Sequence, residues 1–414
     1  MPKSSPDPVG SQRLADTLIE TVLGEIHDQA VVEFTQALVR IPSVNGEEAE
    51  AADFVARACR QGGLEVTVRD VHDGRPNVLA VLPGRKSNDI GLLLHGHTDT
   101  VPFLGMKNPL SGEVVNGHIW GRGSVDQKGG LAASVMALLA LARADVPLAK
   151  GVAVAAVIDE ESEHRGSMAL VDEGFRADFA IVTEPSDLRL LVGCKGTAPI
   201  RITLTGVLAH GSNPWLGVNA IEKAARVVIA LGEIEPRAVE VPGVGRMQGS
   251  INVGLIEGGT AYNNVADRCS LWLDRRMVPG ETQATVLEEI RALLDDLAAQ
   301  DPDFKAMAEI ARPDWRWERI KERGLNPAMV SLDSQIVAAV RMSHQRVVGE
   351  PVELGYTHGY MDMDFLINDL GIPTVNYGPG DTAYSHTDHE RLRVDHLLAA
   401  TRVYALTALI LAGG

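Results

Sequence analysis

The sequence predicts an α/β protein: a mostly parallel-sheet domain with helices on both faces, interrupted by an inserted ferredoxin-like α+β sandwich domain. Two observations support this fold class. Outside residues 196–312, short apolar runs alternate with helical stretches, as in a buried, largely parallel sheet. Inside that range the expected elements follow the order β-α-β-β-α-β, which is the order of a split βαβ sandwich.

The elements outside the insert follow from the spacing of apolar residues. Spacings of three and four predict helices over residues 12–39, 47–61, 130–144 and 167–173. Short apolar and β-branched runs predict strands over residues 64–68, 77–82, 90–94, 152–158, 179–183 and 374–377. The apolar tail over 397–412 is interrupted by Arg402 and is short for a bilayer span, so we expect a core helix there.

The insert is predicted by the same reasoning. Its strands are expected over residues 199–205, 249–256, 268–273 and 304–310, and its helices over 219–231 and 281–299. This organisation places a discontinuous domain at 12–195 and 313–414 around an inserted domain at 196–312. The polar, proline-rich residues 1–11 are expected to be disordered.

Composition and charge exclude several classes of function. The 414 residues include 38 Lys and Arg against 55 Asp and Glu, which gives a net charge of −17. Because no basic run could neutralise phosphates, we expect no nucleic-acid partner. The N-terminus lacks the apolar stretch of a signal peptide, and we expect no membrane partner. The three cysteines form no CxxC pair, which makes a disulfide framework improbable and favours the cytoplasm.

Acids and imidazoles gather where predicted strands end. His97 and Asp99 follow the strand over 90–94, and two further strands are followed by the acids Glu160, Glu161 and Glu184. In open α/β sheets, ligands bind at the carboxyl ends of the strands. Taken singly, each segment is also compatible with a surface turn or a solvated loop.

Two loops add one acid and one imidazole. Asp126 stands in the glycine-rich turn over 121–130, where it replaces the third glycine of a G-x-G-x-x-G phosphate loop. An anion is a poor neighbour for phosphate, so the turn is predicted to present a carboxylate, or to cap a helix. His386 stands in a Gly/Pro loop after the strand over 374–377; alone, it is equally compatible with a surface position.

The combined set has the composition of a metal centre with two ions. Two imidazoles and three carboxylates can hold two zinc-type ions that share one bridging carboxylate. The members of this set are His97, Asp126, Glu161, Glu184 and His386.

These segments resemble the motifs of the M20 family of metallohydrolases. This group contains acetylornithine deacetylase, succinyl-diaminopimelate desuccinylase, aminoacylase-1 and glutamate carboxypeptidase. The resemblance covers nearly the whole chain and keeps the order of five motifs. They are G-H-x-D-x-V-P at 96–102, G-R-G-x-x-D-x-K-G-G at 121–130, D-E-E at 159–161, E-P-S at 184–186, and G-P-G with a later His at 378–386.

The resemblance implies a role for each residue of the set. One ion would be held by His97, Glu184 and Asp126, and the other by His386, Glu161 and the same Asp126. Glu160 would act as the general base, and Asp99 would orient His97. The resemblance also implies a cis peptide bond between Asp126 and Gln127.

The insert carries three further residues that resemble family positions. His210, in the A-H-G-S segment, would reach the active site of a partner subunit and hold the developing oxyanion, which implies a homodimer formed through the inserted domain. Asn264 would contact substrate. Arg276, in the D-x-R segment over 274–279, would clamp a substrate carboxylate; an ordinary salt bridge is the alternative, and the adjacent Arg275 is a competitor.

Two positions depart from the family pattern. Ala266 stands where relatives carry a different turn residue, and Asp364 stands where many relatives have an arginine. Loss of that positive charge weakens the expectation of a dicarboxylate substrate and favours a neutral or basic side chain.

These observations predict a metal-dependent amidohydrolase that removes the acyl group of an N-acyl-amino acid through a metal-bridged hydroxide. Its cofactors would be two divalent ions, zinc first, with cobalt or manganese as alternatives. A dipeptidase or carboxypeptidase of the same fold, acting on short peptides, is the alternative within the enzyme class. A non-catalytic binding paralogue is the alternative outside it. A serine hydrolase is set aside because the chain has no G-x-S-x-G motif.

Overall fold

The computed structural model describes residues 8–312 and 317–413 and divides the chain into two compact units. The first comprises residues up to Gly193, Met329–Tyr356 and the chain from Met361 onward, and the second comprises Cys194–Ala328 and Thr357–Tyr360. The insert therefore extends past the predicted return at residue 313. It does so because the chain after that point pairs back onto the insert: Thr197 N donates to Leu325 O at 2.8 Å.

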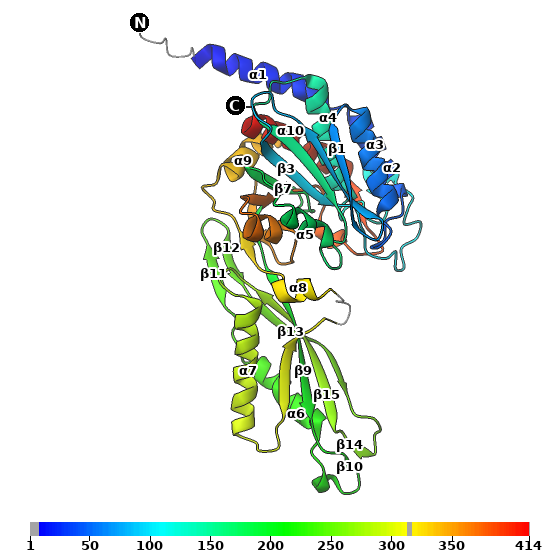
Figure 1. Cartoon of the computed structure of the whole chain (residues 1–414), viewed down its shortest axis with the longest axis vertical. Helices are drawn as coiled ribbons and strands as arrows, with labels where there is room; N and C mark the ends of the chain where they lie inside the picture. The colour runs from blue at the N-terminus through cyan, green and yellow to red at the C-terminus, as the bar shows by residue number, and fades with distance from the viewer. Residues whose placement is uncertain (1–7, 313–316, 414) are drawn as a thin grey trace. The chain divides into compact units, whose positions relative to one another are not determined.

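The first unit is built on a central sheet with helices packed against it (Figure 1). Its elements in chain order are α1 (Pro8–Gly24), α2 (Asp28–Arg40), α3 (Ala49–Gln61), β1 (Glu65–His72), β2 (Arg75–Leu82), β3 (Ile90–His97), β4 (Glu113–Val115), β5 (His118–Trp120), α4 (Lys128–Ala144), β6 (Gly151–Val157), α5 (Arg165–Asp172), β7 (Phe179–Val182), β8 (Leu190–Cys194), β17 (Ala328–Met329), α9 (Gln335–Val348), β18 (Leu354–Thr357), β19 (Thr374–Asn376), β20 (Arg391–Arg393) and α10 (Val394–Ala412).

The N-terminal helical region differs from the prediction in two ways. Helix α1 begins at Pro8, inside the segment 1–11 that was expected to be disordered; residues 1–7 lie outside the described residues. The single helical stretch predicted over 12–39 is divided into α1 and α2, because α1 ends at Gly24 and His27 has an extended backbone.

The central sheet is mixed, with its parallel part in the middle. The strand order is β1-β2-β6-β3-β7-β19-β8-β17, with β18 beside β8. Strand β3 runs parallel to β6 and β7, and β19 runs parallel to β7, whereas β1, β2 and β8 pair antiparallel. The β1–β2 hairpin turns at Asp73-Gly74, where both residues have positive φ, a two-residue hairpin signal that the prediction of a mostly parallel sheet missed.

Strand β3 lies at the point where the strand order reverses. The chain passes from β3 through α4 to β6 on one side, and then from β6 through α5 to β7 on the other side of β3. Right-handed crossovers in opposite directions place α4 and α5 on opposite faces of the sheet. In such sheets, ligands bind outside the carboxyl ends of the strands at this point, which here is the end of β3.

Helix α10 is a core helix of this unit. By length and composition, this helix of 19 residues could cross a membrane. The prediction that the tail is too short for a bilayer span was therefore wrong about its length. The helix packs against α4, α9 and β3, and Leu397, Val403 and Tyr404 are fully buried. These contacts are typical of a helix inside a globular core.

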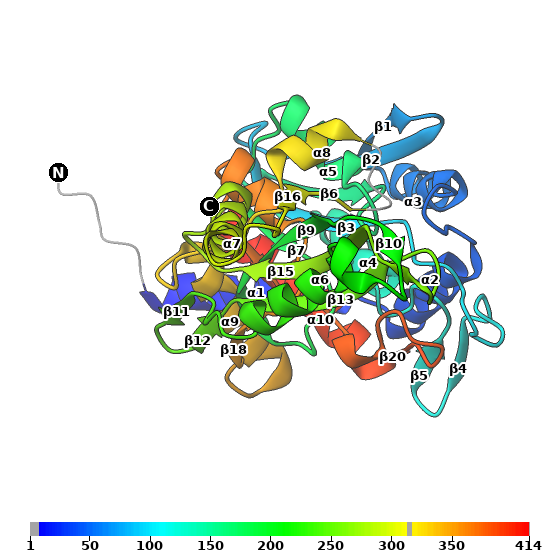
Figure 2. The same cartoon turned by 90° about the horizontal axis from the view of Figure 1, so that it is seen from below.

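A small sheet beside the main one holds the chain that leads into α4. Strand β5 pairs with β4 on one side and with β20 on the other (Figure 2). Leu392 of β20 lies opposite Ile119 of β5, and both are fully buried. This sheet therefore fixes the loop that runs from β5 to α4 at its N-terminal end.

The second unit is the predicted ferredoxin-like sandwich (Figure 1). Its elements are β9 (Gly196–Thr205), β10 (Ala209–His210), α6 (Ala220–Leu231), β11 (Ala238–Val241), β12 (Gly245–Gln248), β13 (Ser250–Gly258), β14 (Asn264–Val265), β15 (Arg268–Met277), α7 (Gln283–Ala299), β16 (Ala306–Ile310) and α8 (Glu318–Arg323). The antiparallel order β13-β15-β9-β16 and the helices α6 and α7 enclose one core. Alternate residues of β9, such as Ile200, Ile202 and Leu204, are fully buried in this core.

The same alternation separates the two adjacent arginines of β15. Arg275 is fully buried, and its Nη2 lies 2.6 Å from Glu281 Oε1 and 3.3 Å from Glu289 Oε2. The side chain of Arg276 is 31% exposed and pairs through Nε with Asp274 at 3.0 Å. Arg275 therefore stabilises the insert, and Arg276 is the arginine whose side chain reaches solvent.

We expect Arg275→Met to lower the free energy of unfolding of the insert by about 3–5 kcal/mol, because two glutamates lose their buried cation. The matched control Arg276→Met should change it by less than about 1 kcal/mol, since that ion pair is partly exposed. Urea unfolding of the full chain, followed by circular dichroism, measures both. Equal stability of the two variants would contradict the structural role of Arg275.

Candidate metal centre

The five predicted ligands come together at the carboxyl edge of the parallel strands. His97 ends β3, Glu161 follows β6, and Glu184 follows β7, while His386 lies in the loop after β19. Asp126 comes from the loop between β5 and α4. Because β3, β6, β7 and β19 run in the same direction, their carboxyl ends meet at one edge of the sheet.

The ligands form two sets that share one carboxylate. In the first set, His97 Nε2 lies 3.3 Å from Asp126 Oδ1 and 3.3 Å from Glu184 Oε1. In the second set, His386 Nε2 lies 3.3 Å from Asp126 Oδ2 and 3.1 Å from Glu161 Oε1. The two oxygens of Asp126 therefore face different sets, which is the arrangement of a bridging ligand.

These distances fit divalent metal ions. Two tetrahedral zinc ligands, each about 2.0–2.1 Å from the ion, lie about 3.3 Å apart. His97 Nε2 is fully buried and has no hydrogen-bond partner among the described residues, although buried polar atoms are normally satisfied. A cation between His97, Asp126 and Glu184 would satisfy this nitrogen, so the donor set fits the implied metal.

The negative charges of the cluster also favour the binding of cations. Burial and the negative charge of Asp126 raise the pKa of Glu184 to about 7, and they also raise the pKa of Glu161. Hydrogen bonds that the imidazole donates to Asp126 and Glu161 raise the pKa of His386 to about 10. Burial lowers the pKa of His97, but the surrounding carboxylates have the larger effect and raise this pKa well above the usual value. In the absence of metal, the cluster therefore binds protons to balance its carboxylates.

Asp99 supports the cluster at two places. The side chain of His97 has its Nδ1 at 2.9 Å from the backbone O of Asp99 and at 3.4 Å from Oδ1 of the same residue. The nearer acceptor is therefore the carbonyl, and the predicted carboxylate contact is longer. The Asp99 carboxylate also accepts the backbone N–H groups of Glu160 at 3.2 Å and Glu161 at 3.0 Å. It thus ties the strand end that carries Glu160 and Glu161 to the strand end that carries His97.

Glu160 lies next to the ligands without belonging to either set. Its Oε2 is 3.9 Å from His97 Nε2. Burial, followed by the negative charge of Glu184, raises the pKa of Glu160 well above its usual value. A carboxyl group with a raised pKa beside a metal centre can accept and return a proton near neutral pH.

The prediction missed Gln127, which holds one of the ligands. Its Nε2 donates a short hydrogen bond to Glu184 Oε1, and its Oε1 accepts from Thr183 Oγ1 at 2.8 Å. A side chain at Gly96 would meet Gln127 Oε1 at 2.6 Å, so any larger residue there would displace Gln127. The sequence feature that could have pointed to Gln127 is its position directly after Asp126. The resemblance implied a cis peptide bond between these two residues, and the structure contains it.

A third group of potential ligands lies behind Glu160. The ligand atoms of Glu160, His164 and Asp362 lie within 4.8 Å of one another. His164 Nδ1 is 2.8 Å from Asp362 Oδ1, and Ser167 Oγ donates to Asp362 Oδ2 at 2.6 Å. Because both oxygens of Asp362 are engaged by side chains, this group is a hydrogen-bond network supporting the site.

The other predicted site residues belong to the second unit. His210 and Asn264 lie directly opposite each other in the β10–β14 ribbon, and His210 Nδ1 is 2.7 Å from Ser212 Oγ. Arg276 forms the ordinary ion pair with Asp274 that was its alternative role. The roles of His210, Asn264 and Arg276 toward substrate stay predictions.

The two departures from the family pattern are both buried. Ala266 accepts the backbone N–H of Ala220 at 2.8 Å, at the start of α6. Asp364 Oδ1 accepts from Asn368 Nδ2 at 2.7 Å. Asp364 thus has a bonding partner within its own turn.

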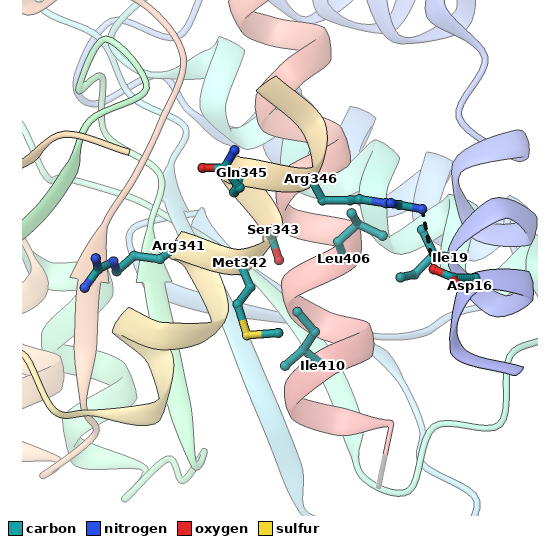
Figure 3. Close-up of a pocket in the computed structure, with 9 residues that line it drawn as sticks. All are labelled: Asp16, Ile19, Arg341, Met342, Ser343, Gln345, Arg346, Leu406 and Ile410. Carbon is teal, nitrogen blue, oxygen red and sulfur yellow. Dashed lines mark hydrogen bonds and ion pairs between the residues drawn. The ribbon is translucent and has the colours of Figure 1, made fainter. Parts of the chain in front are cut away.

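An unrelated apolar pocket of about 730 Å³ lies between α1, α9 and α10 (Figure 3). Ile19, Met342, Leu406 and Ile410 supply its apolar wall, and Arg346 lies 3.5 Å from Asp16 at its rim. No predicted site residue lines it, so it is not the candidate site.

Comparison with known proteins agrees with this geometry. The family model described as peptidase family M20/M25/M40 matches residues 93–410. The chain is 28% identical to N-formyl-4-amino-5-aminomethyl-2-methylpyrimidine deformylase of Bacillus subtilis over 406 residues, which cover 92% of this chain and 94% of that protein. It is 29% identical to acetylornithine deacetylase of Aliivibrio salmonicida over 374 residues, which cover 87% and 93%.

Solved structures share the fold. A tripeptidase from Staphylococcus aureus superposes with a TM-score of 0.77 at 24% identity, covering 94% of this chain and all of that one. The family model spans more than half of the chain and includes all five motif segments. The chain therefore belongs to the M20/M25/M40 family of peptidases and is a hydrolase of amide bonds.

Proposed function

We propose that this chain is a two-metal hydrolase that removes a small acyl group from the nitrogen of an N-acyl-amino acid. The observation that carries the proposal is the shared carboxylate: the two oxygens of Asp126 each lie 3.3 Å from a different imidazole. The relatives named above include a deformylase and a deacetylase, and these names support cleavage of the bond between an acyl group and nitrogen.

Zinc is the proposed metal. The ligands are imidazole nitrogens and carboxylate oxygens, a set that zinc accepts readily and that also suits cobalt and manganese. When bound, the two ions would lower the pKa of a water molecule and polarise the acyl carbonyl.

Glu160 is proposed to move the proton. It would accept a proton from the attacking water and return it to the leaving nitrogen, so one carboxylate serves as base and then as acid. The backbone N–H of Glu160 donates to the Asp99 carboxylate, which restricts the position of the Glu160 Cα. In the insert, Arg276 and Asn264 would bind the substrate carboxylate, and His210 would donate to the oxyanion.

A homodimer formed through the insert is part of the proposal. Strand β13 is the outermost strand of its sheet, and its Leu255 and Ile256 are 54% and 56% exposed. An exposed apolar edge strand is a ready surface for pairing with another chain. A cytoplasmic location is also proposed, and the buried free thiols of Cys59 and Cys269 support it.

Turnover of a substrate panel tests the function. With zinc or cobalt supplied, we expect hydrolysis of formyl, acetyl, succinyl or carbamoyl amino acids at rates well above those for dipeptides, because the names of two relatives give a small acyl group, formyl or acetyl, as the group removed. Hydrolysis of each substrate is measured as the release of free amine. Faster hydrolysis of dipeptides would favour the peptidase alternative, and no turnover with two ions bound would favour a binding paralogue.

Glu160→Gln and His210→Ala should each be nearly inactive, with kcat lowered about 10²- to 10⁴-fold for the first and about 10²-fold for the second. Elemental analysis should still find two ions per chain in Glu160→Gln.

If His210 acts across the dimer, a refolded mixture of the Glu160→Gln and His210→Ala variants should recover about a quarter of wild-type activity, from random pairing of subunits. Failure of the mixture to recover activity would place His210 outside the partner's site.

Metal binding should release protons. At pH 7 the metal-free protein holds a proton on His386, whose pKa is about 10, and part of one on Glu184, whose pKa is about 7. The ion takes deprotonated ligands, so affinity should rise with pH and proton release should fade as the pH approaches the higher pKa. Calorimetric titration of zinc in two buffers of different ionisation enthalpy measures the release. A heat that is independent of buffer would contradict it.

A further inference from the structure

One buried carboxylate lies behind the loop that carries Asp126 and has no place in the roles given above. Glu390 is fully buried, and so is Arg122 beside it. Glu390 immediately precedes β20 and lies on the same segment as the ligand His386. The segment that supplies one metal ligand therefore also brings a carboxylate to the loop of another.

The contacts of Glu390 are directed at the backbone of that loop. Its Oε1 accepts the N–H of Val125 at 3.0 Å and the N–H of Asp126 at 3.1 Å. Its Oε2 accepts from Arg122 Nη1 at 2.6 Å. Hydrogen bonds to a charged acceptor are the stronger kind, and here two of them end on consecutive peptide groups.

The position of Glu390 is itself fixed by the small sheet. Arg391 of β20 lies opposite Trp120 of β5, and Gly121 N lies 3.4 Å from Glu390 O. The loop from β5 to α4 is therefore held at its start by backbone pairing and at Asp126 by the Glu390 carboxylate.

A buried ion pair is weak evidence of stabilisation. Desolvation of the two charges opposes their attraction, and an apolar pair of similar volume often stabilises as well or better. What an apolar pair could not do is accept the N–H groups of Val125 and Asp126. The chemistry of Glu390 is thus matched to the direction of the loop backbone.

We propose that Glu390, oriented by Arg122, is a positioning residue that sets the bridging carboxylate of Asp126 between the two ions. Holding the N–H of Asp126 fixes its Cα, and so fixes where its two oxygens fall relative to His97 and His386. This inference rests on the proposed two-ion site.

The test uses the full chain, stripped with a chelator and titrated with Mn²⁺. For Glu390→Gln we expect the affinity for the pair of ions to fall about 10- to 100-fold, the usual effect of losing an outer partner of a metal ligand. The magnetic coupling between paired Mn²⁺ ions, measured by electron paramagnetic resonance, should weaken. With substrate, kcat should fall while KM stays unchanged. Glu390→Asp keeps the charge but shortens the reach, and should give the same pattern if Glu390→Gln fails to fold.

Glu25→Gln is the matched control, because Glu25 pairs with Arg143 at 3.3 Å on the surface. All its readouts should equal those of the wild type. Wild-type coupling and kcat in Glu390→Gln or Glu390→Asp, with only a lower melting temperature of the metal-free protein, would overturn the positioning role. Wild-type protein that binds no pair of ions would instead overturn the proposed function, and the positioning role with it.

Discussion

The arrangement around Asp126 is the constraint on which the rest of the first unit depends. Two divalent ions close together repel each other, and an anion between them offsets that repulsion. The surrounding acids have the opposite problem, because burial and mutual repulsion raise the pKa values of Glu160, Glu161 and Glu184. Ions and acids therefore stabilise each other, and the fold has to deliver both ligand sets to the two sides of one carboxylate.

The sheet delivers them through the reversal of strand order at β3. Parallel strands on both sides of β3 end at the same edge, so short loops are enough to bring ligands from distant parts of the chain together. Rigid strand ends give more exact placement than long loops do. The final adjustment is made by side chains behind the ligands, such as Gln127 on Glu184 and Asp99 on the backbone of Glu160 and Glu161.

The two units carry different parts of the proposed chemistry. The first unit holds every predicted metal ligand and the proposed base, whereas the residues predicted to recognise substrate belong to the insert. Within the insert, strand alternation gives adjacent arginines opposite tasks: Arg275 is enclosed with Glu281 and Glu289, and Arg276 reaches solvent.

The kinds of residue at the site, the order of their motifs and the element order of the insert could be predicted from the sequence. These are local properties, because strand ends, glycine turns and hydrophobic periodicity depend on neighbouring residues. The mixed sheet, the extension of the insert to Ala328 and the contacts of Gln127 and Glu390 with the predicted ligands became known from the folded chain. The reason is physical, because strand pairing and side-chain partners depend on contacts between residues far apart in the chain. Glu390 and Asp126, for example, are 264 positions apart, and no local pattern links them.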